Sequence, residues 1–212
     1  MMTMRFETIR LGGGWDECIG DVEPRGVWFV WGNSGNGKTT AVVSLCRQLV
    51  PHGRILYNSK EEGTSLSMQN TVRRFGMADF GSAFKVADMT IDELDEVLSK
   101  PRSQKIVVLD SIQFMGFSYK RFREFCDKYA GRKLLIFVSR ASGTRPEGRP
   151  ANSAMYDASL KIWVEGYKAF SKGRFIGQTG ECVIWPEGAR RYWAGYGHTR
   201  DYDNNDENTE EL

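Results

Sequence analysis

A glycine-rich loop that ends in lysine and threonine follows the first long apolar segment of the sequence. Residues 32–39 read GNSGNGKT and match the phosphate-binding pattern G-x-x-x-x-G-K-[ST] at every fixed position. In this pattern the glycines let successive backbone N–H groups turn towards phosphate oxygens. Lys38 would reach the β- and γ-phosphates, and the hydroxyl of Thr39 would ligate magnesium. The loop therefore predicts an ATP–Mg²⁺ site, and the residues expected to line it are Gly32, Asn33, Ser34, Gly35, Asn36, Gly37, Lys38, Thr39 and Thr40.

Three acidic residues are placed to complete such a site. Asp110 ends the apolar run IVVLD and matches a Walker B carboxylate, which emerges at the carboxyl end of a central strand, close to Thr39 and the magnesium ion. Glu61 and Glu62 follow another strand-length segment, residues 54–59, and the carboxyl ends of parallel strands share one ligand crevice. A carboxylate there can accept a proton from the water that attacks the γ-phosphate. Two plainer interpretations stay open, since Asp110 could cap a helix and the glutamates could form a solvated turn.

Apolar patterns predict the elements that hold these residues. Strands are expected at 26–32, 54–59, 84–89, 105–113 and 133–142, and helices after the glycine loop and at 64–75, 90–98 and 118–130. Thr90 and Glu93 form a capping box at the start of one of these helices. Beyond residue 159, short strands are expected at 159–164, 167–172 and 181–185. The sequence thus predicts an α/β fold with a mostly parallel central sheet, helices on both faces and a C-terminal antiparallel β extension.

Charge is unevenly distributed along the 212 residues. The net charge is +2, but the last twelve residues, DYDNNDENTEEL, contain six acidic residues and no lysine or arginine. Subtracting these six from 27 acidic residues leaves 21 against 29 basic ones, so the body carries +8. Such a body either favours a polyanion or is an ordinary soluble surface. We expect one domain over residues 1–200 and a disordered acidic tail over 201–212.

The cysteines are scattered along the chain. Cys18, Cys46, Cys126 and Cys182 form no CxxC pair, and only two histidines accompany them, so a zinc site is not expected. Scattered cysteines without a signal peptide predict a cytoplasmic protein. No apolar segment is long enough to predict a membrane span.

Four segments, GNSGNGKTT, LYNSKEEG, VVLDS and LIFVSRAS, together resemble the RecA superfamily, in particular the RadA-type and DnaB-type ATPase cores. The resemblance covers residues 24–190 and implies a RecA-like fold and magnesium-dependent ATP hydrolysis. At matching positions it implies that Glu61 is the catalytic glutamate, with Glu62 as the alternative. It also places a γ-phosphate sensor after FVS, at Ser139 or Arg140.

A further segment, SKGRFIGQTGE at 171–181, is similar to the Lys-x-Arg segment by which RadA and DnaB subunits reach a neighbour's ATP site. The similarity implies that Lys172 and Arg174 stabilise transition-state charge in trans, within a homo-oligomeric ring or filament. The chain departs from the family by one extra residue between Arg174 and Gly177. A surface hairpin with two basic residues is the alternative interpretation.

Residues 140–155, RASGTRPEGRPANSAM, are rich in glycine and proline and longer than an ordinary connection, which predicts a mobile loop. In RecA-like proteins this position is a DNA-contacting loop. The resemblance therefore implies phosphate contacts from Arg140, Arg145 and Arg149.

A second segment, residues 114–124, alternates aromatic with basic side chains. Phe117 and Tyr119 could stack on bases while Lys120 and Arg121 bind phosphates. The phenylalanines of this segment could instead belong to the core.

The zinc and protease-like modules of RadA and the helical N-terminal domain of DnaB have no counterpart in the sequence. What remains resembles compact phage-encoded recombination ATPases. The resemblance thus implies an ATPase that acts on single-stranded DNA in recombination, repair or strand annealing, in the host cytoplasm if phage-encoded. Expected partners are further copies of the chain, single-stranded DNA and a single-strand-binding protein. Two alternatives stay open: a small-molecule or nucleotide kinase, and an ATP-gated regulatory or scaffold protein of RecA fold.

Overall fold

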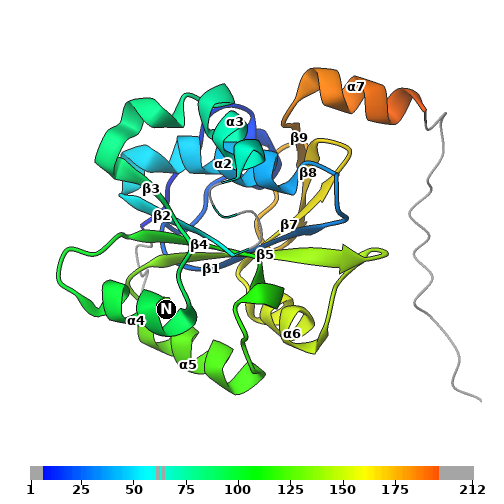
Figure 1. Ribbon diagram of the computed structural model, residues 1–212. Helices are drawn as coiled ribbons and strands as arrows, with labels where there is room; N and C mark the ends of the chain where they lie inside the picture. Colours follow the sequence, from blue (N-terminus) through cyan, green and yellow to red (C-terminus); the bar gives the residue numbers. More distant parts are fainter. Residues whose placement is uncertain (1–6, 61–62, 64, 196–212) are drawn as a thin grey trace, which may run out of the picture.

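The computed structural model describes residues 7–60, 63 and 65–195, which form one nine-stranded sheet with helices on both faces (Figure 1). The strands are β1 (Gly26–Gly32), β2 (Ile55–Ser59), β3 (Phe84–Ala87), β4 (Ile106–Asp110), β5 (Leu134–Ser142), β6 (Arg145–Pro146), β7 (Leu160–Glu165), β8 (Lys168–Gly173) and β9 (Glu181–Val183). Their order is β3-β2-β4-β5-β1-β7-β8-β9, with β6 paired to β5 outside this path. Pairs from β3 to β7 are parallel, and β8 and β9 are antiparallel. The predicted α/β class and antiparallel C-terminal extension are confirmed.

The helices bury two separate cores against this sheet. They are α1 (Trp15–Ile19), α2 (Lys38–Leu49), α3 (Leu66–Arg74), α4 (Ile91–Ser99), α5 (Tyr119–Tyr129), α6 (Arg149–Asp157) and α7 (Pro186–Ala194), with short 3₁₀ turns at Val50–His52, Met77–Ala83 and Ile112–Phe114. Helices α1, α2 and α3 cover one face, and α4, α5 and α6 cover the other (Figure 1). Strand β1 lies between β5 and β7 and is buried from its second residue on, so the glycine loop starts from the centre of the sheet.

The predicted long loop over residues 140–155 is wrong. Strand β5 continues to Ser142, and the chain turns at Gly143 and returns as β6, so this region begins as a β-hairpin. Helix α6 then starts at Arg149, with Pro150 in its first turn. Proline fits the first turn of a helix because the N–H it lacks would have no partner there. Glycine and proline therefore mark a hairpin turn and a helix start rather than an unstructured connection.

The phenylalanines of residues 114–124 divide between core and surface. Phe117 and Phe122 are buried and pack edge-to-face, whereas Phe114 and Tyr119 are 46% and 47% exposed. The core interpretation therefore holds for Phe117, which is not available for base stacking.

All four cysteines are buried and free. Burial raises the pKa of Cys46 and Cys126, to about 12 for Cys126, so both thiols stay protonated near neutral pH. Contact with Cys18, followed by burial, raises the pKa of Cys182. No helix within the described ranges is both long and apolar enough to cross a membrane.

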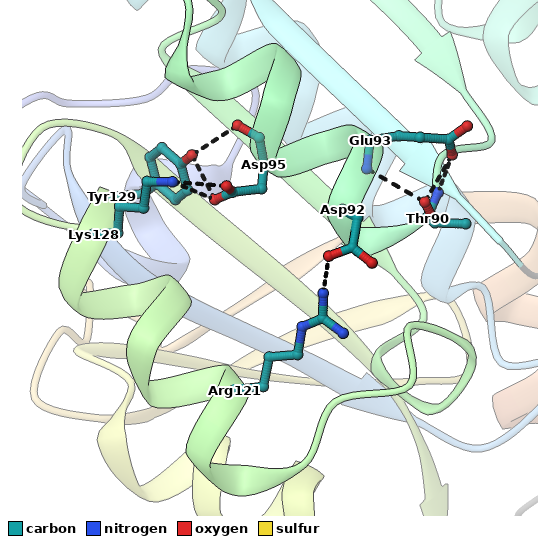
Figure 2. A network of polar contacts seen from close by, with 7 residues as sticks. All are labelled: Thr90, Asp92, Glu93, Asp95, Arg121, Lys128 and Tyr129. Carbon is teal, nitrogen blue, oxygen red and sulfur yellow. Dashed lines mark hydrogen bonds and ion pairs between the residues drawn. The ribbon is translucent and has the colours of Figure 1, made fainter.

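Helices α4 and α5 are joined by ion pairs and hydrogen bonds (Figure 2). Thr90 and Glu93 form the predicted capping box at the start of α4. Asp95 accepts hydrogen bonds from Lys128 Nζ (2.7 Å) and from the buried Tyr129 hydroxyl (2.8 Å). Burial tends to raise the pKa of Asp95, but these hydrogen bonds outweigh it and hold the pKa below its ordinary value of 3.8.

Asp95→Asn tests this joint, because it removes the charge while keeping the size of the side chain. A depressed carboxyl pKa adds stability above the ordinary Asp pKa, and that stability disappears as pH falls through the folded-state pKa. The variant should lose less than about 1 kcal/mol at pH 7, because the pair is half exposed. Urea unfolding at pH 7 and at acid pH should show a difference only at pH 7. An equal difference at both pH values would contradict an electrostatic origin.

Candidate nucleotide site

The glycine loop ends at the start of α2, where the N-cap residue is a glycine and so has no side chain that could cap the helix. Gly37 is the N-cap residue, in the left-handed conformation (φ 90°), and the first turn of α2 contains no acidic residue. Gly35 is also left-handed (φ 77°), and no atom lies within 4 Å of where a Cβ would be. An uncapped helix start with open backbone in front of it suits an anion, because the N–H groups and the helix dipole both favour negative charge.

Lys38 lies across this loop. Its Nζ donates to the carbonyl oxygen of Asn33 at 3.0 Å, which holds the ammonium group over the residues that would surround a phosphate. A negatively charged phosphate oxygen attracts the ammonium group more strongly than a neutral carbonyl oxygen does. An incoming phosphate can therefore replace the Asn33 carbonyl as the partner of Lys38.

Asp110 lies on the same face of the sheet as α2. Side chains alternate along a strand, and Val108, two residues earlier, belongs to the core beneath α2. Asp110 is 4% exposed, and the Tyr57 hydroxyl donates to its Oδ2 at 2.6 Å. The neighbouring Ser111 hydroxyl is buried and has no hydrogen-bond partner among the described residues. A buried carboxylate beside an unsatisfied hydroxyl fits a hydrated Mg²⁺, which prefers oxygen ligands and keeps several waters.

Register places Asp110 and the glycine loop at one edge of the sheet. Strand β5 separates β4 from β1, so their backbones lie about 10 Å apart. Gly32 pairs with Arg140 of β5, and Asp110 pairs with Val138, two residues earlier. The two predicted halves of the magnesium site therefore leave the same carboxyl edge on the same face.

The predicted catalytic residues Glu61 and Glu62 lie outside the described residues. The last described residues before them lie next to Asp110. Ser59 pairs with Asp110 in the sheet, and the Lys60 N–H donates to the Asp110 carbonyl oxygen at 2.7 Å.

The turn between β7 and β8 is hydrogen-bonded to the glycine loop. The Gly166 N–H donates to Asn36 Oδ1 at 3.0 Å, and the Tyr167 N–H donates to the Asn36 carbonyl oxygen at 3.1 Å. A Cβ on Gly37 would come within 2.5 Å of the Tyr167 ring. Tyr167 itself is left-handed (φ 61°), which is uncommon for a bulky residue and persists only where surrounding contacts fix it.

Helix α7 and the residues before it supply those contacts. Trp185 packs edge-on against Tyr167 at 4.9 Å between ring centroids, and the Arg74 guanidinium lies 4.8 Å from the Trp185 ring centroid. Trp193 Nε1 donates to the Gly166 carbonyl oxygen at 3.1 Å. Sequence reasoning missed this support, and Gly166-Tyr167 between two predicted strands was its only local signal.

The glycine loop also contacts the β5–β6 hairpin. Asn33 Nδ2 donates to the carbonyl oxygen of Gly143 at 3.1 Å, and Trp31 Nε1 donates to that of Thr144 at 3.0 Å. One hydrogen bond from the nucleotide loop and one from the end of β1 therefore connect this region to the hairpin turn.

The sensor candidates, Ser139 and Arg140, differ in their surroundings. The buried Ser139 hydroxyl accepts from Gln113 Nε2 at 2.8 Å, and the same Nε2 donates to the Glu147 carbonyl oxygen at 2.9 Å. The Arg140 guanidinium stacks over the Phe114 ring, with 4.6 Å to the centroid. Gln113, which sequence reasoning did not single out, therefore links the end of β5 to the segment after the hairpin.

The remaining predicted DNA contacts fall into two groups. Arg145 in β6 and Arg149 at the start of α6 are exposed. By contrast, Lys120 lies 3.9 Å from Glu124, and Arg121 forms an ion pair with Asp92 (Figure 2). The hairpin arginines are thus better available to an external phosphate than the α5 residues.

Lys172 and Arg174 do not line the glycine loop of their own chain. Lys172 pairs with Lys161 of β7, which is level with Phe29, three residues before Gly32. That offset is about 10 Å along the strand, and Arg174 lies beyond the end of β8. Within one chain, both residues are therefore displaced towards the amino-terminal end of β1.

Comparison with known proteins identifies the fold. No protein family model and no curated protein matches the chain. Among solved structures, a KaiC-like protein from Pyrococcus horikoshii matches with a TM-score of 0.61 and 15% identity, over 86% of this chain and 100% of that one. The flagellar accessory protein FlaH from Methanocaldococcus jannaschii matches with a TM-score of 0.59 and 14% identity, over 83% and 90% of the two chains. The fold is RecA-like.

Asn36 provides a test of how this RecA-like domain holds its nucleotide loop. Asn36→Ala leaves the buried Gly166 N–H without its acceptor, so the free energy of unfolding should fall by about 1–3 kcal/mol and nucleotide affinity should fall with it. Asn36→Asp keeps the acceptor but adds a negative charge beside the phosphates, so it should weaken binding with little loss of stability. Thermal unfolding and titration with a fluorescent ATP analogue would separate the two effects. Asn70→Ala, which removes the same side chain at an exposed position on α3, is the control and should lower neither.

Proposed function

We propose that this protein is a magnesium-dependent ATPase that assembles with itself and couples ATP hydrolysis to single-stranded DNA. The observation that carries the proposal is the shared carboxyl edge of β1 and β4, where an uncapped helix start, Lys38 and the buried Asp110 meet on one face of a RecA-like sheet. The resemblance to RadA and DnaB cores supports the choice of hydrolysis and of DNA.

The binding residues follow from this geometry. The backbone N–H groups at the start of α2 would hold the β-phosphate, and Lys38 would exchange its Asn33 partner for the β- and γ-phosphate oxygens. Thr39 and Asp110 would hold Mg²⁺, with Tyr57 orienting the carboxylate. When bound, Mg²⁺ neutralises charge on the β- and γ-phosphate oxygens.

Hydrolysis requires a base for the attacking water, and we assign this role to Glu61. Its carboxylate would accept one water proton while the water oxygen bonds to the γ-phosphorus. The bond between the γ-phosphorus and the bridging oxygen then breaks, and ADP and inorganic phosphate leave.

The displacement of Lys172 and Arg174 from their own nucleotide loop supports a site shared between subunits. A basic residue in this role stabilises mainly the charge that develops in the transition state, and a neighbouring chain can supply it. Each site would then take the glycine loop, Asp110 and Glu61 from one subunit, and Lys172 with Arg174 from the next.

Coupling to DNA would use the β5–β6 hairpin. Its exposed Arg145 and the nearby Arg149 would bind phosphates without reading bases. Because Asn33 and Trp31 are hydrogen-bonded to the hairpin turn, a change in the glycine loop on nucleotide binding would move the hairpin as well.

A second candidate is an ATP-gated scaffold. One of the solved structures of similar fold is a flagellar accessory protein. A scaffold role for the present protein would require its subunits to assemble without DNA. Stimulation of hydrolysis by single-stranded DNA separates the candidates, since neither a scaffold nor a small-molecule kinase should respond.

The shared site is tested by mixing two defective subunits. Glu61→Gln should retain ATP binding and reduce hydrolysis by roughly two orders of magnitude or more. Arg174→Ala should also bind ATP and lose most turnover. In mixtures, some interfaces pair an intact Glu61 with an intact Arg174, so activity should partly return. Mixed assemblies without recovered activity at any ratio would contradict a shared site, and a defect only in Glu62→Gln would transfer the base to that residue.

Coupling is tested by Trp31→Phe, which keeps an aromatic ring in the core but removes the N–H that holds Thr144. Basal hydrolysis should be retained, while stimulation by an oligothymidylate should fall. Trp163→Phe is the matched control, because Trp163 packs against Trp31 but donates to Glu165 instead of the hairpin. Equal stimulation in wild type and both variants would exclude this route.

A further inference from the structure

Basic residues precede four adjacent strands at the end of the sheet opposite the nucleotide site. They are Arg54 before β2, Lys105 before β4, Lys133 before β5 and Arg25 before β1. These strands begin in one register, and hydrogen bonds extend the ladder through the basic row. The bonds run from Lys105 N to Arg54 O (3.1 Å), from Leu134 N to Lys105 O (2.9 Å) and from Gly26 N to Lys133 O (3.0 Å). Four basic residues therefore follow one another at intervals of about 5 Å.

A groove of about 490 Å³ opens beside this row. It is lined by Val50, Pro51, His52, Gly53, Arg54, Ala83, Arg102, Ser103 and Lys105, among which there is no acidic residue. Within the described ranges, Arg54, Arg102 and Lys105 form no ion pair with a carboxylate. Like charges on neighbouring strands are destabilising, so an anion bound there would be stabilising.

The turn before β4 is held in place by cations from both sides. The buried Lys133 donates from Nζ to Ser103 Oγ and to the Gln104 carbonyl oxygen, each at 2.8 Å. The Arg54 guanidinium donates to the Arg102 carbonyl oxygen. Arg102 itself is left-handed (φ 60°), a conformation that such contacts must maintain. The turn thus presents Arg102 and Lys105, both exposed, from a fixed backbone.

We infer that Arg54 and Lys105 of the basic row, together with Arg102, bind the sugar–phosphate backbone of a single-stranded nucleic acid through their exposed side chains, as a second contact separate from the hairpin. Guanidinium groups match phosphate geometry, and the groove beside these cations is lined by no carboxylate that would repel a phosphate. No phenylalanine, tyrosine or tryptophan lines the groove, so the contact would depend on phosphates rather than on stacked bases. The loop between α4 and β4 lies at the left of Figure 1, and the β5–β6 hairpin projects at the right. A strand bound at both would run along the whole length of the sheet.

The inference rests on the proposed nucleic-acid partner but not on hydrolysis. The acidic segment 201–212 of another copy is the competing occupant. Its acids, at 201, 203, 206, 207, 210 and 211, are irregularly spaced, which favours the nucleic acid.

The test is the double variant Arg102→Gly with Lys105→Ala. Glycine adopts the left-handed conformation at no cost, so the turn should stay folded. Binding of a fluorescent oligothymidylate, measured over a range of salt concentrations, should weaken. The slope of log affinity against log salt should become shallower by about 0.7 for each lost contact, or about 1.4 in total. Arg73→Ala with Arg190→Ala removes the same charge from exposed positions on α3 and α7 and should keep the wild-type slope.

Three outcomes would overturn the inference. An unchanged slope in the double variant, with wild-type binding intact, removes the row and leaves the hairpin as the DNA site. Failure of wild-type protein to bind oligothymidylate removes both this inference and the proposed DNA coupling. If a synthetic peptide of residues 201–212 binds wild type but not the double variant, and oligothymidylate binding is unaffected, the row is a site for an acidic segment instead.

Discussion

The hydrogen bonds between Asn36 and the turn at Gly166 and Tyr167 determine where the nucleotide loop sits. Residues 130 positions apart meet there, and the bonds use both the side chain and the carbonyl of Asn36. A glycine loop has little conformational preference of its own, so its shape must come from its neighbours. The β7–β8 turn supplies one wall, and Trp185 and Trp193 in turn hold that turn. The antiparallel extension is therefore part of the nucleotide site rather than an appendage to it.

The two ends of this parallel sheet carry different kinds of side chain. At the carboxyl end, strands β1 and β4 deliver the glycine loop and Asp110 to one face of the same edge, so groups distant in sequence lie close together. At the amino end, a basic residue directly precedes each of these strands, and these residues lie in a single row. The core between the ends is largely apolar, and neither end can change its spacing without shifting the strands. One register thus fixes the geometry of both surfaces.

Local patterns predicted much of this arrangement. The glycine loop, Asp110 at the end of β4 and the Thr90–Glu93 capping box depend on residues close together in sequence, and each element is present where expected. The support from Tyr167 could not be predicted, because it depends on a contact between the glycine loop and a hairpin far along the chain. Helix α6 was missed because Pro150 marks a helix start as readily as a loop. The ion pairs of Arg121 and Lys128 likewise depend on how α4 and α5 pack, which periodicity does not specify.

The aromatic support of the nucleotide loop has an optical consequence. Trp31 leads into the loop and packs against Trp163 at 5.7 Å, while Trp185 and Trp193 hold the turn that contacts Gly37. By contrast, Trp15 and Trp28 are fully buried in the core. Four of the six indoles are thus within a few contacts of the phosphate-binding backbone, and Trp185 also stacks with the Arg74 cation. Any rearrangement of the loop alters the polarity around these rings, so the intrinsic tryptophan emission of the unlabelled protein should report on the state of its glycine loop.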